Sequence, residues 1–331
     1  MHHAPPTIDT PGKLDPNEQQ FRIPGPLPGL HLFLRYLPPT TPSATPHRIV
    51  LYVHGGTFPS ALSIAHRFDG ESWRDTLCAA GFHTWGLDFH GFGALSDPYP
   101  EMADPADAHA PLGRVDSASS QLEAATRFIC NYHRTPRISL IAHSWGTLVA
   151  GHLAGRCPDL IERMVFFGAI ASRGTPSAPT QLPAWRLISL QDQWNRFVAD
   201  VPDGAQPVLS RRHFDDWGER YLDADPASRT RSPPAVKTPS GAFQDIFDTW
   251  AGHLPYDPAL IRAPVMLLRG EWDSYCTDAD ARSLFDALIA SPQRRDVKIG
   301  RATHLMHLEE NRYALYREAQ AFLAGGDRPP Q

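Results

Sequence analysis

The strongest constraint on the fold comes from the stretch Ile138-Ser-Leu-Ile-Ala-His-Ser-Trp-Gly146. Its apolar beginning predicts a buried strand, and the apolar segment 147–154 that follows it predicts a helix. Between them, Ser144 has a small residue two positions before it, Ala142, and another two positions after it, Gly146. A sharp strand–turn–helix connection that exposes a nucleophilic serine requires small residues at these positions. Glycine is usual at both, so Ala142 is a mild departure, and Ser144 is a candidate nucleophile.

Strands and helices alternate along most of the chain. Apolar runs predict strands over residues 30–37, 48–53, 82–88, 138–141, 164–167, 264–270 and 296–300. Helical patterns occupy residues 71–80, 116–133, 147–154, 278–290 and 308–324. The alternation predicts an α/β fold with a doubly wound, mostly parallel sheet.

Composition divides the chain into a tail, a core and an insertion. Residues 1–20 are polar and proline-rich, which predicts a flexible N-terminal tail. We expect the core to consist of residues 21–170 and 263–331. The alternation stops between them, and residues 171–262 combine prolines, tryptophans and short helical stretches. This pattern predicts a mainly helical cap inserted between two late strands, above the carboxyl ends of the strands, where open α/β sheets bind ligands.

A serine nucleophile needs an acid that orients its base, and one carboxylate has the expected place for this acid. Asp273 follows the predicted strand 264–270, with Glu271 and Asp278 as alternatives. Asp88 also ends a predicted strand, but it precedes Ser144, and the order Ser–Asp–His is expected in this strand–turn–helix arrangement. We interpret Asp88 as structural.

The candidate base is His304, which lies directly after the last predicted strand. His307 is its rival, three residues further on. The pair could also bind a metal together with Glu309, since histidine and carboxylate ligands suit zinc. No third ligand is suggested elsewhere in the sequence, so we expect neither a metal nor another cofactor.

The candidate oxyanion hole follows the strand 48–53, at His54-Gly55-Gly56-Thr57. The amide of Gly56 or Thr57 could point into a pocket, and the amide of Trp145 would supply a second donor. The alternative is an ordinary glycine turn after a strand. Gly55 and His143, which precedes the serine, are candidate substrate contacts, and His143 could equally be a packed pocket wall.

Taken together, these motifs resemble the α/β-hydrolase fold superfamily. The resemblance covers the chain from about residue 30, apart from the insertion, and rests on His54-Gly55-Gly56, Asp88-x-x-Gly91-x-Gly93, Ala142-x-Ser144-x-Gly146, Asp273 and His304. It implies that Ser144 attacks a carbonyl while His304 takes its proton and Asp273 holds the imidazolium. It also implies that Gly56 and Trp145 bind the oxyanion before water cleaves the acyl-enzyme.

The resemblance leaves the reaction open among several classes. We expect a hydrolase for a carboxylic ester, lactone or thioester of a small to medium apolar acyl substrate. An acyltransferase, a carbon–carbon bond or amide hydrolase, and a non-catalytic binding protein remain alternatives. A serine argues against the dehalogenases and epoxide hydrolases of the superfamily, which use aspartate. Aromatic residues of the insertion, such as Phe197, Phe243 and Phe247, favour an apolar substrate, although they could simply form the core of the cap.

Composition excludes some partners. A net charge of −5 gives no electrostatic reason to expect nucleic acid or an anionic membrane surface. No apolar run approaches the ~20 residues needed to cross a bilayer, and the first residues lack a signal-peptide pattern. The four cysteines, which form no Cys-x-x-Cys pair, indicate reduced thiols. We therefore expect a cytoplasmic protein with a small-molecule substrate, and a homodimer stays open.

Overall fold

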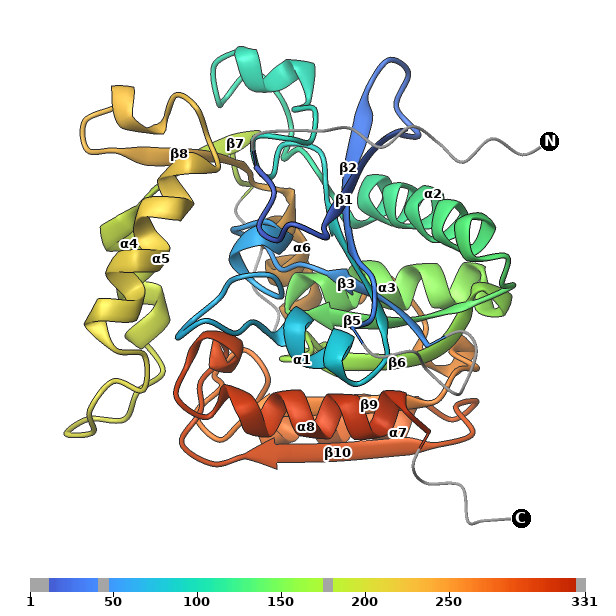
Figure 1. The fold of residues 1–331 in the computed structure, drawn as a ribbon. Helices are drawn as coiled ribbons and strands as arrows, with labels where there is room; N and C mark the ends of the chain where they lie inside the picture. Colours follow the sequence, from blue (N-terminus) through green and yellow to red (C-terminus); the bar gives the residue numbers. More distant parts are fainter. Residues whose placement is uncertain (1–11, 41–47, 175–180, 326–331) are drawn as a thin grey trace.

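The computed structural model describes residues 12–40, 48–174 and 181–325. An eight-stranded sheet with the order β1-β2-β4-β3-β5-β6-β9-β10 forms its centre (Figure 1). The strands are β1 (Gln19–Pro24), β2 (His31–Leu37), β3 (Ile49–Val53), β4 (His83–Asp88), β5 (Ile138–His143), β6 (Ile161–Phe167), β9 (Val265–Gly270) and β10 (Arg294–Ile299). The β1–β2 and β2–β4 pairs are antiparallel and the other pairs are parallel, which confirms the predicted doubly wound, mostly parallel sheet.

Helices cover both faces of the sheet. On one face α2 (Val115–His133), α3 (Trp145–Arg156) and α7 (Asp278–Ala287) bury apolar side chains in a common core. On the other face α1 (Trp73–Ala79) and α8 (Arg312–Leu323) do the same. Short 3-10 turns lie between the elements at η1 (Ser60–Leu62), η2 (Pro100–Ala103), η3 (Pro158–Leu160) and η6 (Met306–Leu308).

The burial of the central strands explains why their sequences are apolar. All residues of β3, β5 and β9 are buried, because helices cover both faces of the sheet at these positions. The strands β3, β5, β6 and β9 run parallel to one another, so their carboxyl ends lie along the same edge. Residues that directly follow these strands therefore meet at one place.

The start of the chain corrects the predicted tail. Residues 1–11 lie outside the described part, but Gln19 and Gln20 belong to β1, so a flexible segment over residues 1–20 is wrong at its end. Glu18 is buried and accepts hydrogen bonds from Arg35, at 2.9 Å, and from Arg74. These ion pairs hold the chain before β1 against the core.

The inserted segment 171–262 packs in two ways; its residues 175–180 lie outside the description. A two-stranded sheet of β7 (Trp185–Ser189) and β8 (Ala235–Pro239) accompanies α4 (Leu190–Val198), α5 (Arg211–Asp223) and η4 (Ser228–Thr230). These elements lie to one side of the central sheet (Figure 1). Apolar side chains of β7, β8, α4 and α5 form a cluster of their own with a few residues of the core, namely Phe58, Leu62, Phe68, Leu305 and Leu308. In contrast, α6 (Gly241–Trp250), which is followed by η5 (Pro258–Leu260), contributes Ala242 and Ile246 to the core around α3. Hereafter "the cap" means residues 185–239, and its role as a lid stays a prediction.

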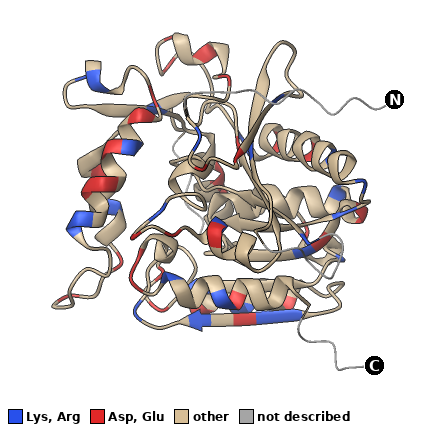
Figure 2. Cartoon of the chain, in the orientation of Figure 1, with Lys and Arg blue, Asp and Glu red and all other residues tan. Residues whose placement is uncertain are grey.

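Neither the surface charge nor the cysteines point to a functional site. Basic and acidic residues are interspersed on α4 and α5 (Figure 2). All four cysteines are free. Within the described residues, no helix combines the length and apolar character needed to span a membrane.

Candidate active site

Ser144 occupies a strained turn between β5 and α3. Its backbone has φ of 56° and ψ of −126°, a conformation that is rare for residues other than glycine. The amide of Ser144 donates to the carbonyl oxygen of Phe167 at 2.9 Å, which fixes the turn against the end of β6. A methyl group on Gly146 would lie 2.6 Å from the carbonyl oxygen of His54, so the turn requires glycine there. Ala142, the other small position, is fully buried in the core.

Asp273 and His304 lie together at the same edge of the sheet. Nδ1 of His304 donates to the Asp273 carboxylate, with distances of 2.9 Å and 3.0 Å to its two oxygens. The amides of Tyr275 and Cys276 donate to Oδ1 of Asp273 at 2.9 Å and 3.0 Å, which orients the buried carboxylate. Because Nδ1 carries the proton, Nε2 of His304 is left as an acceptor. Within the described residues this Nε2 has no hydrogen-bond partner, and Ser144 lines the same pocket.

Gly168, directly after β6, makes room for this pair. Its φ is 59°, and a methyl group there would lie 2.8 Å from Nδ1 of His304 and 3.2 Å from Oδ2 of Asp273. Any side chain at this position would push the imidazole away from the carboxylate. The site therefore needs Gly168, which the sequence reasoning did not single out.

The rival base, His307, contacts no carboxylate in the described residues. Its ring is buried, both of its nitrogens lack partners, and it stacks on Phe58 with ring centroids 6.1 Å apart. Burial lowers the pKa of His307 to about 3. The carboxylate of Glu309 instead accepts from the amide and hydroxyl of Thr303. No group of three metal-ligating side chains occurs in the described part of the chain.

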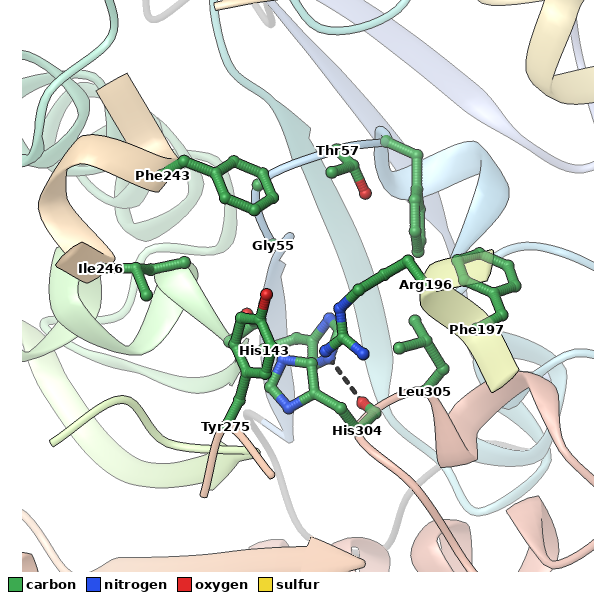
Figure 3. Close-up of a pocket in the computed structure, with 13 residues that line it drawn as sticks. Gly55, Thr57, His143, Arg196, Phe197, Phe243, Ile246, Tyr275, His304 and Leu305 are labelled. Atoms are coloured by element: carbon green, nitrogen blue, oxygen red, sulfur yellow. Dashed lines mark hydrogen bonds between the residues drawn. The ribbon is translucent and has the colours of Figure 1, made fainter. Parts of the chain in front are cut away.

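His143 supports the loop that carries His304. Its Nε2 donates to the carbonyl oxygen of His304 at 3.0 Å (Figure 3), and its ring stacks on Phe167 with centroids 4.4 Å apart. Burial holds the pKa of His143 well below its ordinary value, so the imidazole is neutral. Its ring borders the pocket, but its one hydrogen bond is structural.

The predicted oxyanion loop is held in place by His54. Nδ1 of His54 donates to the carbonyl oxygen of Gly55 at 2.7 Å, and Nε2 accepts from the amide of Phe89 at 3.2 Å. Gly55, Gly56 and Thr57 all line the pocket that contains Ser144. The loop can therefore present amides to a ligand there.

Trp145, the second predicted donor, begins α3, where helix amides have no partner within the helix. Its indole Nε1 donates to Asp245 of α6 at 2.9 Å. The same carboxylate accepts from the amide of Val115 at 2.9 Å and pairs with Arg114. Asp245 thereby ties the turn to α2 and α6, a role that no local sequence signal reveals.

The pocket encloses about 440 Å³ of empty space, including the part open to solvent. Its apolar wall combines rings and aliphatic chains from both the core and the cap, namely Phe58, Phe197, Phe243, Ile246, Tyr275 and Leu305. Of the aromatic residues predicted to meet substrate, Phe197 and Phe243 reach it, whereas Phe247 is partly exposed. One cation, Arg196 of α4, joins the wall and was not anticipated from sequence (Figure 3).

Most of the chain matches one known protein family. A family model described as the alpha/beta hydrolase family matches residues 50–318. A search of curated proteins found no match.

Solved structures with the same fold span nearly the whole chain. A serine hydrolase from Cycloclasticus zankles is 13% identical, with a TM-score of 0.60, over 94% of this chain and 100% of that chain. A thermophilic esterase from Thermogutta terrifontis is 18% identical, with a TM-score of 0.56, over 93% and 98%. A mutant of potato epoxide hydrolase is 16% identical, with a TM-score of 0.61, over 93% and 99%. At these identities the likeness establishes the fold and leaves the chemistry to the residues of the site.

Proposed function

The chain belongs to the alpha/beta hydrolase family, and on this premise we propose that it is a serine hydrolase that cleaves a carboxylic ester, lactone or thioester through an acyl-enzyme on Ser144. The observation that carries the proposal is the arrangement of Asp273 and His304 beside the strained turn of Ser144. The proton on Nδ1 of His304 is held by Asp273, and the free Nε2 lies in the pocket that Ser144 lines.

The first half of the reaction forms the acyl-enzyme. Nε2 of His304 takes the hydroxyl proton as Oγ of Ser144 attacks the substrate carbonyl, and the Asp273 carboxylate stabilises the imidazolium. The carbonyl oxygen becomes an oxyanion, which we expect the amides of Gly56 and Trp145 to bind. One such donor is typically worth about 10²–10³ in turnover. The leaving group then departs with the proton from His304.

The second half repeats these steps with water. His304 takes a proton from water, the hydroxide attacks the acyl carbonyl, and the tetrahedral intermediate collapses to release the acid and restore Ser144. The serine also bears on the epoxide hydrolase likeness. That reaction uses an aspartate nucleophile, and Ser144 stands in the strained turn here.

The pocket wall supports an apolar acyl group. Most of the side chains that line it are aromatic or aliphatic, which is typical of small-molecule sites. The test is a chain-length panel of 4-nitrophenyl esters and lactones, measured on wild type, Ser144→Ala and His304→Ala. We expect both variants to lose cleavage. Cleavage that survives in Ser144→Ala would refute the proposal.

A further inference from the structure

The cap places a guanidinium at the pocket wall, where one of its nitrogens has an ion pair and another has no partner in the described residues. Arg196 lies in the last turn of α4, and its side chain points to the cavity above His143 and His304 (Figure 3). Its ion pair is with Asp200, at 3.4 Å from Nη1. The other oxygen of Asp200 already accepts from the hydroxyl of Ser274 at 2.5 Å. Nη2 of Arg196 is buried and has no hydrogen-bond partner in the described residues.

Aromatic rings hold Arg196 in this position. Its guanidinium carbon lies 4.0 Å from the centroid of the Tyr275 ring, and that ring lies 4.9 Å from the ring of His304. Stacking on an aromatic face leaves the planar edge of a guanidinium free to bind a planar anion. The Tyr275 ring thus lies against both the guanidinium and the ring of His304, and Arg196 lines the same pocket as Ser144.

A second cap arginine adds positive charge behind the pocket wall. The guanidinium carbon of Arg186, on β7, lies 3.5 Å from the ring centroid of Phe243, which lines the pocket. Within the described residues Arg186 forms no ion pair, and its buried Nε has no partner. Burial lowers the pKa of this guanidinium. Within the described residues, the two cations thus form one ion pair, that of Arg196 with Asp200, and the charge of Asp192 acts on Arg186 from a greater distance.

One part of this guanidinium is costly in the free protein. The buried Nη2 of Arg196 has lost its hydration and, within the described residues, gains no hydrogen bond in return. A ligand that brings an anion into the pocket recovers this cost, and carboxylates match the guanidinium fork in shape.

We propose that the substrate carries a carboxylate, which Arg196 binds while the scissile carbonyl lies at Ser144. The substrate is then a monoester or monothioester of a dicarboxylic acid, or a lactone or ester with a comparable acidic group. The apolar wall packs the methylene chain between the two ends. This inference rests on the proposed serine hydrolase function, but the binding of the carboxylate can be measured without it.

The test compares matched esters. Mono-4-nitrophenyl esters of adipic, pimelic and suberic acid are each paired with a neutral ester in which an isopropyl group replaces the carboxylate. Charge-assisted hydrogen bonds predict that wild type prefers the anionic member by about 10- to 100-fold in kcat/KM at the best chain length. In Arg196→Met this ratio should fall to about one or below, with the change mainly in KM. Arg196→Lys should keep part of it.

Arg211→Met is the matched control. Arg211 also belongs to the cap, but its side chain is exposed and pairs with Asp215, so the same loss of charge should leave the ratio intact. Equal kcat/KM for the two esters on wild type would overturn the proposal. So would an Arg196→Met variant that slows both esters by the same factor, since that result indicates stabilisation of the oxyanion instead.

A binding experiment separates this inference from the proposed function. Adipate, pimelate or suberate should raise the Tm of Ser144→Ala and should have no such effect on the Ser144→Ala, Arg196→Met double variant. Binding without ester cleavage by wild type would refute the serine hydrolase and keep the carboxylate site. Ester cleavage by wild type, with no dicarboxylate binding and no anionic preference, would refute the carboxylate site and keep the hydrolase.

Discussion

Replacing Gly146 by alanine should disturb the candidate site through the backbone. The added methyl would lie 2.6 Å from the carbonyl oxygen of His54 and 2.7 Å from that of Val53. Close C–H···O contacts have about 3.3 Å between carbon and oxygen, so the turn between β5 and α3 must move about 0.7 Å away from the end of β3. Gly55 and Gly56 follow His54 directly, and the separation therefore moves the oxyanion loop away from Ser144.

The size of this effect follows from the shift. A misplacement of about 1 Å can cost about 10²-fold in rate, so we expect Gly146→Ala to lower kcat/KM for 4-nitrophenyl acetate by about 10- to 100-fold. Overpacking should also lower the free energy of unfolding by about 1–3 kcal/mol, measured by urea titration. Gly155→Ala, on the same helix, meets no atom closer than 3.8 Å and should be neutral or stabilising by up to about 1 kcal/mol. Wild-type activity and stability in Gly146→Ala would refute this reasoning.

Three further predictions concern the histidines and carboxylates of the site. Asp273→Asn should lower kcat by about 10⁴-fold with the fold intact in circular dichroism, because the orientation of His304 depends on this carboxylate; near-normal kcat would exclude the assignment. His307→Leu should keep most ester cleavage. If His307→Leu were inactive and His304→Ala active, the base would be His307 and not His304. Burial raises the pKa of Glu309 to about 7, so the folded protein holds this proton more tightly than the unfolded chain and loses stability as pH rises from about 4.5 to 7. Glu309→Gln should remove this loss. Across that pH range, the free energy of unfolding of the variant should rise relative to that of wild type by up to about 3 kcal/mol, measured by urea titration. Parallel pH profiles for the two proteins would contradict this prediction.

The features that sequence predicted best are local or follow from strand order. The spacing around Ser144 predicts the turn because a strand, a tight connection and a helix leave few choices for small residues. The apolar runs predicted the central strands, since both faces of a parallel sheet are buried. Asp273 and His304 each follow a late strand, and the parallel sheet brings such positions to one edge.

The features that sequence missed depend on distant contacts. No strand is predicted over residues 19–24, and the predicted tail extends to residue 20, because polar residues conceal an alternation in which Phe21 and Ile23 are buried. In the sequence, Gly168 resembles any other glycine that follows a strand, and its importance depends on its contact with His304. Nothing near Arg196 in the sequence indicates that α4 turns this side chain toward the pocket.

The role of Ser144 as the nucleophile is tested most directly by covalent labelling. Wild type and Ser144→Ala are treated with a fluorophosphonate, and the modified peptide is identified by mass spectrometry. If Ser144 is the nucleophile, it is the one residue phosphonylated in wild type, ester cleavage is lost in proportion to labelling, and the variant carries no label. Absence of label at Ser144, or ester cleavage that persists after complete labelling, would contradict it.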